Sequence, residues 1–433
     1  MGDAGRRQRC AGVAAEFQLN HSRVPPVWLL GLSNSTVGLN SGIAFFVVPQ
    51  LLAAQHVREA SIAVITAAAM SSNFWPVVFG PMLDVWFSRR WYATVFAALS
   101  SILVVVALMN LRRPAVLEAA LIAGVAAAML FTTALCGWLS TVCRHEDKNK
   151  LSAWVNIAVI SGTGVTSVVG GELARHLPIW LAACLLGAIV FLPTAIFLLI
   201  PCAGPDKRLA GDSFAEFRRE VLALLRRREV LIALVLLLSP CSSFALTNLL
   251  GGLGADFHAS ARVVSLAGGL GAFFPGILGC LLFPLIARRR PLIFLYLADG
   301  ILGSLFTLSL IFLPHTPVTF TVALVGEYLF QAFAFSIQVG IMFETIGPNN
   351  PLAATAFTVL SAATYVPITY MMVADGGGYS LRGIAGSFGM DAAISIASCL
   401  LIGLLLYRLS GKSFHLAVPE PIRRVDRSPD SAY

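Results

Sequence analysis

Long apolar runs alternate with short polar segments along almost the whole chain of 433 residues. A helix that crosses the hydrocarbon core of a membrane needs about 20 mostly apolar residues. Twelve runs meet that length, and they cover roughly residues 27–50, 60–82, 91–111, 115–139, 151–171, 179–201, 230–250, 263–286, 291–311, 318–343, 352–374 and 384–407. The pattern therefore predicts an all-α integral membrane protein with twelve transmembrane helices.

Composition supports a membrane protein and argues against a soluble enzyme. Only 12% of the residues are charged, whereas a soluble domain carries about 25%. The eight cysteines are scattered, without the spacing of a disulfide framework or a metal site. The sequence also has no dinucleotide-binding glycine pattern, complete phosphate-binding loop or nucleophile motif. We therefore expect a protein that is not an enzyme and that uses no cofactor and no metal.

Lysine and arginine are distributed unevenly between the polar segments. If the N-terminus lies inside, the cytoplasmic segments hold 24 of the 30 basic residues and the outer segments hold six. Basic residues are enriched on the cytoplasmic side of membrane proteins, so we expect both termini in the cytoplasm. This topology accounts for the net charge of +8 without a nucleic-acid partner. The excess of arginine over lysine, 26 to 4, favours a GC-rich bacterial genome and hence the cell inner membrane.

The longest polar interruption, residues 202–229, divides the predicted spans into two sets of six. It separates an N-terminal half, 27–201, from a C-terminal half, 230–407, and tails of residues 1–26 and 408–433 flank the halves. The first two spans of each half are interrupted by polar residues, glycine or proline at corresponding positions. Such matching interruptions are typical of transporters that are built from repeats.

The linker between the halves carries seven basic residues. Residues 213–216 have the form of a capping box, and Phe214, Phe217, Val221 and Leu224 follow at helical spacing. This pattern predicts an amphipathic helix on the cytoplasmic membrane surface, with its arginines near anionic lipid. A solvated tether is the alternative.

A short motif closes the second predicted span: Gly80 is followed by Asp84 and then by the basic pair Arg89 and Arg90. It resembles the loop signature of the major facilitator superfamily, although one extra residue separates Asp84 from the arginines. The resemblance implies a bundle of two six-helix halves that rock around a central cavity, with Asp84 pairing across helix ends in one state. We expect these four residues to act in gating; a basic loop that only sets the topology is the alternative.

Within that superfamily, residues 79–84 resemble the W-[AS]-P-x-x-D segment of the muropeptide permeases (AmpG-type). Acetyl-coenzyme A transporters and certain siderophore importers share this segment, and Phe79 stands here in place of its tryptophan. The resemblance implies that the substrate is a cell-wall fragment, a siderophore or a related conjugate.

Ionisable residues inside the predicted spans are a strong functional signal, because a buried charge is costly in a bilayer. Asp299 and Glu327 lie near the middle of the ninth and tenth spans, and Gln331 and Gln338 share a helical face with Glu327. A buried carboxyl on such a face is what a proton carrier requires, so we expect Glu327 and Asp299 to couple transport to protons. Structural hydrogen bonding between helices is the alternative.

The other ionisable residues give weaker signals. Asp391 and Glu118 lie nearer the ends of their spans, and we expect them at the membrane interface. The spans contain no histidine, which argues against a histidine-based proton relay. The sequence also predicts no buried lysine or arginine, which argues against tight charge pairing with an anionic substrate.

Neutral polar residues within the spans form a second set. Asn and Thr inside membrane helices either contact a substrate or bond to a neighbouring helix, and the sequence leaves both roles open. The candidates for the substrate cavity are Asn40, Asn156, Asn248, Gln331, Gln338, Thr358 and Tyr365.

These signals together predict a secondary active transporter that uses the proton gradient to move a small organic solute by alternating access. We expect its partners to be the solute, protons and membrane lipid, and we expect a monomer. An efflux permease for amphiphilic compounds and a transporter-like membrane signal sensor are the alternatives.

Overall fold

The computed structural model describes residues 25–200, 214–347 and 350–409. Helices and helical turns make up nearly all of these ranges. The N-terminal half consists of α2 (Val27–Leu32), α3 (Ser35–Gly42), η1 (Ile43–Val47), α4 (Val48–Ala54), α5 (Glu59–Ser71), η2 (Ser72–Phe74), α6 (Pro76–Phe79), η3 (Gly80–Asp84), α7 (Arg89–Met109), α8 (Pro114–Val142), η4 (His145–Asp147), α9 (Lys148–His176), α10 (Ile179–Phe191) and η5 (Leu192–Leu198).

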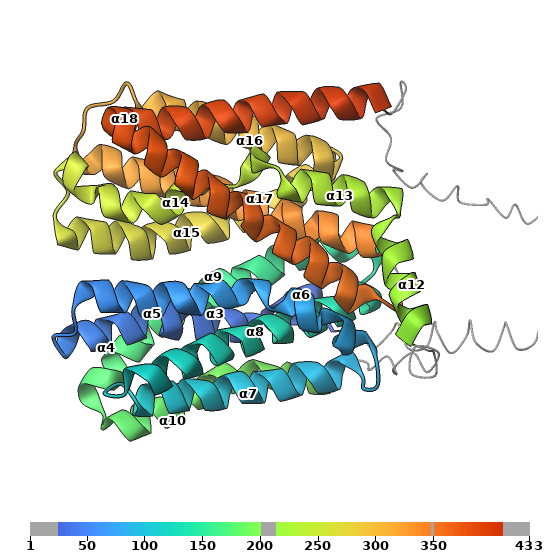
Figure 1. Ribbon diagram of the computed structural model, residues 1–433, viewed down its shortest axis with the longest axis horizontal. Helices are drawn as coiled ribbons and strands as arrows, with labels where there is room; N and C mark the ends of the chain where they lie inside the picture. The colour runs from blue at the N-terminus through green and yellow to red at the C-terminus, as the bar shows by residue number, and fades with distance from the viewer. Residues whose placement is uncertain (1–24, 201–213, 348–349, 410–433) are drawn as a thin grey trace, which may run out of the picture.

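The linker helix α12 (Phe214–Leu225) leads into the C-terminal half (Figure 1). That half consists of α13 (Arg228–Leu238), η6 (Pro240–Ser242), α14 (Leu246–Leu250), η7 (Gly251–Phe257), α15 (Ala261–Ala287), α16 (Leu292–Leu310), α17 (Pro317–Ile346) and α18 (Ala353–Leu409).

Nine helical stretches in the described part of the chain are long and apolar enough to cross a membrane. One of them, α18, contains two helices, because the backbone leaves helical geometry at Arg382 and Gly383. Residues 59–84 and 228–257 are largely helical as well, but short turns interrupt them. These elements are consistent with twelve crossing segments, and the predicted all-α membrane fold is confirmed.

Prolines coincide with two of the breaks in the crossing segments. Proline lacks a backbone N–H and clashes with the preceding helical turn. Pro76 lies where α5 gives way to η2 and α6, and Pro240 begins η6 directly after α13. Ser239 is extended and Phe244 has a φ of 47°, so an irregular stretch separates α13 from α14.

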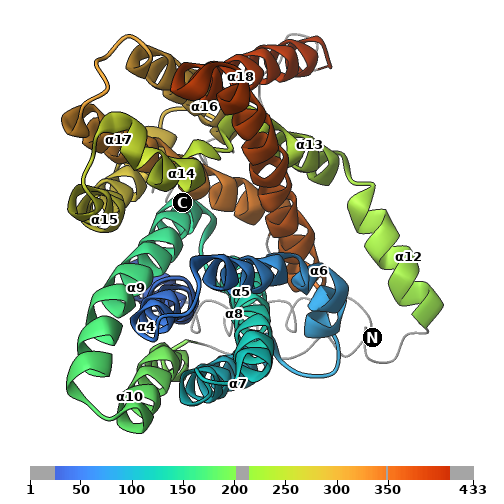
Figure 2. The ribbon, with the colours of Figure 1, turned by 60° about the vertical axis from the view of Figure 1, so that its left-hand side comes forward.

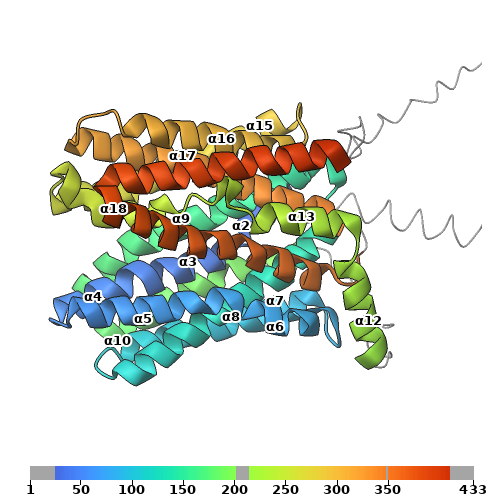
Figure 3. The ribbon, with the colours of Figure 1, turned by 45° about the horizontal axis from the view of Figure 1, so that its top comes forward.

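The linker forms the predicted amphipathic helix. Val221 and Leu224 of α12 pack on the core, whereas Arg219 and Arg226 are exposed; the capping residue Ser213 lies outside the described residues. Figures 1 and 3 show α12 at one end of the bundle, across the direction of the long helices. We call this end the linker end and the opposite one the far end.

The two halves pack against each other along several helices. Figure 2 shows α9 of the N-terminal half beside α15 of the C-terminal half. The first part of α18 crosses from its own half to η3, α6 and α8 at the linker end (Figures 1 and 2). This crossing brings the motif at Asp84 against the start of α18.

Candidate functional site

Asp84 caps a helix of the opposite half. It ends η3, is 5% exposed, and accepts hydrogen bonds from the backbone N–H groups of Ala354 (3.1 Å) and Thr355 (2.7 Å) and from the Thr355 hydroxyl (2.7 Å). The first N–H groups of a helix have no partner within it, and a carboxylate there also complements the helix dipole. The start of α18 is therefore capped from outside its own half.

Arg89 completes this junction. Its Nε and Nη2 donate to Asp84 Oδ1 at 2.9 and 2.8 Å, and Nη2 also donates to the carbonyl oxygens of Asn350 (3.2 Å) and Pro351 (2.7 Å). The guanidinium thus fixes the Asp84 carboxylate and bonds to the chain that precedes α18. The Arg90 side chain is partly exposed and makes no described hydrogen bond to this junction.

Two small residues let α18 approach the N-terminal half closely. A Cβ atom added at Gly80 would lie 2.5 Å from Thr358 Oγ1, and one added at Gly137 would lie 2.9 Å from the Cα atom of Ala354. The Thr358 hydroxyl donates to the carbonyl of Ala354 in its own helix. Thr358 therefore lies in the contact between the halves, where it packs against Gly80.

Lys148 forms a second junction between the halves. Its side chain is buried, with the residue 2% exposed, and Nζ donates to the carbonyl oxygen of Phe343 at 2.7 Å. The last carbonyls of a helix have no internal partner and favour a cation, and Phe343 lies in the last turn of α17. The prediction of no buried lysine is wrong, because α17 covers a residue whose local sequence is polar.

Both junctions lie at the linker end. Among the described residues, the side-chain hydrogen bonds that join the halves are those of Asp84, Arg89 and Lys148. An acid meets a helix N-terminus and a base meets a helix C-terminus, so both contacts are electrostatically favourable and both can be broken by a rigid movement of the halves.

The interior of the C-terminal half holds four carboxyl groups. Asp299 of α16, Glu327 of α17, and Asp375 and Asp391 of α18 are 4%, 1%, 0% and 6% exposed. Asp299 and Glu327 are buried as predicted, whereas the prediction that Asp391 lies at the interface is wrong. No described lysine or arginine forms an ion pair with any of the four.

Sequence analysis missed Asp375 because the predicted eleventh span, residues 352–374, ends directly before it. The helix instead continues to the kink at Arg382. A Cβ atom at Gly378 would clash with the carbonyl of Gly386, so glycine here permits close packing of the two parts of α18.

Glu327 has one hydrogen-bond partner of particular interest. Thr307 Oγ1 lies 2.6 Å from Glu327 Oε1 and 3.1 Å from the carbonyl oxygen of Gly303. The hydroxyl carries one hydrogen and can also accept one. It is therefore positioned between a carboxyl group and a fixed acceptor.

The two glutamines that share a face with Glu327 point to the broken helix of their own half. Gln331 donates to Thr247 Oγ1 at 2.7 Å, and Gln338 donates to the carbonyl oxygen of Ser242 at 3.5 Å. The predicted polar face of α17 thus contacts η6 and α14.

The remaining cavity candidates have mixed surroundings. Asn40 donates to Ser100 Oγ at 2.8 Å, which joins two helices of the N-terminal half, and Asn156 donates to the carbonyl of Ser152 in its own helix. Tyr365 makes an edge contact with Phe74 of the opposite half, with ring centroids 6.3 Å apart. The side chain of Asn248 is exposed.

Comparison with known proteins identifies the class to which this bundle belongs. Residues 30–355 match the Major Facilitator Superfamily. Because the match extends over most of the chain, the protein belongs to this superfamily of transporters. A search of curated proteins finds no match.

Solved structures share the fold at low sequence identity. A bacterial homologue of the iron transporter ferroportin in an outward-facing state is 17% identical, with a TM-score of 0.63 over 89% of this chain and 100% of that one. The proton:xylose symporter XylE is 15% identical, with a TM-score of 0.64 over 90% and 96%. The E. coli fucose:proton symporter FucP is 14% identical, with a TM-score of 0.66 over 88% and 98%.

Proposed function

We propose that this protein is a proton-coupled secondary transporter that moves a small organic solute across the bacterial inner membrane by alternating access. Membership of the Major Facilitator Superfamily supports transport. Two solved structures of the same fold are of sugar:proton symporters, which favours protons as the coupling ion and a small solute as the substrate.

The observation that carries the coupling role is the pairing of Glu327 with Thr307. When Glu327 is ionised, the Thr307 hydroxyl donates to its carboxylate. When Glu327 is protonated, its carboxyl donates to Thr307, whose hydrogen then turns to the carbonyl of Gly303. One hydroxyl rotation serves both protonation states, and this is the property that a reversible proton site needs. Asp299, whose Oδ2 has no partner in the described structure, is the second candidate.

The proposed gating residues are Gly80, Asp84 and Arg89. Lys148, which the sequence did not indicate, joins them because it forms the second junction, and Arg90 contributes only a nearby positive charge. In the proposed cycle the contacts of Asp84 and Lys148 close the linker end while the far end receives solute. Loss of these contacts lets the halves rock and opens the linker end.

The substrate class rests on the resemblance of residues 79–84 to the muropeptide permease group. A cell-wall fragment, a siderophore or a related conjugate is therefore the proposed solute. Candidate contacts to it are Asn248 and Tyr365, together with Gln331 and Gln338 beside the broken helix. Asn40, Asn156 and Thr358 have partners within the bundle and are weaker candidates.

The proposed orientation has the linker end and both termini in the cytoplasm. The excess of basic residues in the segments at this end supports it. Reporter fusions after Pro201 and after Tyr407 should both report the cytoplasm, and a fusion near Arg58 should report the outside. Opposite signals at positions 201 and 407 would contradict an even number of crossings in the second half.

The coupling role is tested with Glu327→Gln in proteoliposomes. Uptake is measured for labelled fucose, xylose, a peptidoglycan digest and ferric siderophores, with and without an imposed pH gradient. We expect the variant to lose accumulation driven by the gradient and to keep exchange at equal pH, because glutamine retains the shape of the side chain but does not titrate.

Glu118→Gln is the matched control, since Glu118 lies in the other half on α8 and should leave coupling unchanged. Undiminished accumulation by Glu327→Gln would move the coupling role to Asp299 or to another ion.

A further inference from the structure

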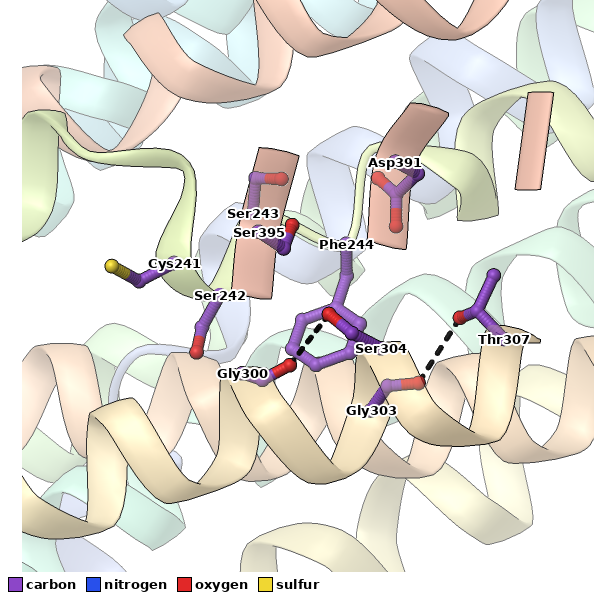
Figure 4. A pocket seen from close by; sticks show the side chains of 10 residues that line it. All are labelled: Cys241, Ser242, Ser243, Phe244, Gly300, Gly303, Ser304, Thr307, Asp391 and Ser395. Atoms are coloured by element: carbon purple, nitrogen blue, oxygen red, sulfur yellow. Dashed lines mark hydrogen bonds between the residues drawn. The ribbon is translucent and has the colours of Figure 1, made fainter. Parts of the chain in front are cut away.

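A small polar cavity lies beside the break between α13 and α14 (Figure 4). Its volume of about 10 Å³ is enough for one water molecule or one ion of similar size. Its walls come from the broken helix, from one side of α16 and from the second part of α18. The lining residues are Cys241, Ser242, Ser243, Phe244, Gly300, Gly303, Ser304, Thr307, Asp391 and Ser395.

Three of the serine hydroxyl groups around this cavity already donate their hydrogens to backbone carbonyls. Ser304 donates to the carbonyl of Gly300 at 2.7 Å, and Ser395 donates to the carbonyl of Pro240 at 3.1 Å. Ser242 donates to the carbonyl of Tyr296 at 2.8 Å. A hydroxyl has a single hydrogen, so these oxygens can present only lone pairs to the cavity.

Two further oxygens at the cavity have no partner in the described structure. They are Oδ1 of Asp391, a residue that is 6% exposed, and Oγ of Ser243, a residue that is 2% exposed. No described lysine, arginine or histidine forms an ion pair with Asp391. A buried carboxylate without a counter-ion is costly, so Asp391 is stabilised either by a proton or by a cation in the cavity, where Ser242, Ser304 and Ser395 present lone pairs.

The irregular backbone beside α13 brings two of the lining serines to the cavity. Membrane transporters use unwound helix segments to bring backbone carbonyls to a bound sodium ion or proton. Here the short 3-10 turn η6 and the irregular residues on either side of it replace the α-helix between Ser239 and Phe244, and this stretch carries Ser242 and Ser243 into the wall of the cavity.

We propose that this cavity is a sodium site, with Asp391 as its charged ligand and Ser243, Ser304 and Ser395 as neutral oxygen ligands. One carboxylate balances one positive charge, and hard oxygen ligands suit alkali and alkaline-earth cations and not soft metals. A water molecule can donate only two hydrogen bonds to this set of acceptors, whereas a cation can engage all of them.

The site adjoins the coupling residue without including it. Thr307 lines the cavity and also bonds to Glu327. Glu327 and Asp375 are further buried carboxyl groups of the same half. The proposed sodium site is independent of the proposed proton coupling. Sodium can bind there whether or not Glu327 is the residue that couples transport to protons.

Sodium binding is tested on the purified full-length protein in detergent at constant pH and ionic strength. Binding of ²²Na⁺ is measured by scintillation proximity, and thermal unfolding is followed as NaCl replaces choline chloride. We expect saturable binding, a saturable rise in Tm with sodium, and a much smaller rise with potassium. Because the experiment involves no transport, failure of the proton-coupling proposal would not affect it.

Three variants locate the site. Asp391→Asn should abolish the sodium-dependent rise in Tm, and Ser243→Ala should weaken ²²Na⁺ binding by about 10-fold or more, because even outer partners of a metal site contribute about 10–100-fold. Asp147→Asn, an acid at the linker end whose partner is Lys150, is the control and should bind as the original chain does.

Identical unfolding curves in sodium and choline, with no saturable ²²Na⁺ signal, would overturn the proposal. Full sodium binding by both Asp391→Asn and Ser243→Ala would also overturn it, since the ion would then bind elsewhere. If Asp391→Asn does not fold, Ser243→Ala and Ser395→Ala decide the question by the same two measurements.

Discussion

Asp84 and Thr355 are 271 residues apart in the chain and lie in opposite halves, yet the carboxylate of Asp84 accepts both the backbone N–H and the hydroxyl of Thr355 at 2.7 Å. The acid therefore acts as the N-cap of a helix to which it is not covalently adjacent. A helix start that needs a partner from the other half is stable only while the halves are together at the linker end. This contact therefore stabilises the closed linker end relative to an open one.

Asp84→Asn should weaken closure of the linker end and slow transport while the protein still folds and inserts. An amide has one acceptor oxygen where the carboxylate has two, and its NH₂ would face the N–H groups of α18. Hydrogen bonds to a charged group contribute about 1.5–3 kcal/mol each, so we expect the open form to gain about 10-fold or more relative to the closed form. Pulsed EPR between spin labels at His145 and Arg290, exposed residues of opposite halves, measures the change.

Asp147→Asn serves as the control for this experiment, because Asp147 pairs with Lys150 in its own half. Unchanged label distances together with unchanged uptake in a well-expressed Asp84→Asn variant would remove the gating role of this acid.

Lys148→Met should open the same end through a different helix. Methionine keeps most of the apolar volume but removes the hydrogen bond of 2.7 Å to the Phe343 carbonyl, which then keeps only the Gly347 N–H at 3.4 Å. A hydrogen bond that involves a charged group contributes about 1.5–3 kcal/mol, so the open population should rise about 10-fold or more. The same pair of spin labels gives the measurement.

Lys150→Met is the matched control for Lys148. Lys150 lies two residues away, its side chain is 43% exposed, and it pairs with Asp147 within the N-terminal half. If both variants shift the label distance equally, loss of charge at the linker end explains the effect and the Phe343 contact does not.

Gly137→Ala should block full closure of the linker end by steric overlap. The new methyl group would lie 2.9 Å from both Cα and N of Ala354, and backbone atoms cannot move aside by rotating a bond. We expect the spin labels at positions 145 and 290 to report a longer distance and uptake to fall. Gly124→Ala in the same helix is the control, since a Cβ atom there meets nothing closer than 3.4 Å.

A Gly137→Ala variant with normal closure and uptake would mean that α18 docks less tightly than this structure describes. The Gly124→Ala variant distinguishes that result from a general tolerance of α8 to alanine.

The parts of this structure that the sequence predicts are those that depend on local composition. Apolar runs predict the crossing segments because a membrane helix must satisfy its own backbone hydrogen bonds and present apolar side chains. Helical spacing likewise predicts that Glu327, Gln331 and Gln338 share a face of α17, and their partners all lie in the C-terminal half.

The features that sequence analysis missed depend on residues far apart in the chain. Lys148 has a polar local sequence, and only its contact with α17 buries it. Asp375 and Asp391 lie in the two parts of α18, which folds back at Arg382 and Gly383, and both are buried in the C-terminal half. Spacing along one helix does not predict such a fold-back, so the carboxyl cluster becomes visible only when the helices are packed.

Thr307→Val tests whether the hydroxyl beside Glu327 is needed for proton coupling. Valine matches threonine in shape but can neither donate to the ionised carboxylate nor accept from the protonated carboxyl. Since a hydrogen bond to a charged group contributes about 1.5–3 kcal/mol, we expect accumulation driven by a pH gradient to fall about 10-fold or more. Exchange of solute at equal pH should be much less affected, because it does not require Glu327 to release its proton.

Thr307→Ser is the matched control, since serine keeps the hydroxyl that now lies 2.6 Å from Glu327 Oε1 and should retain most of the accumulation. Both variants are measured in proteoliposomes at a constant sodium concentration, so that any occupant of the neighbouring cavity is held fixed. If valine supports accumulation as well as serine does, the hydroxyl is not the partner that lets Glu327 change its protonation state. Coupling would then have to depend on Asp299, whose Oδ2 has no partner in the described structure.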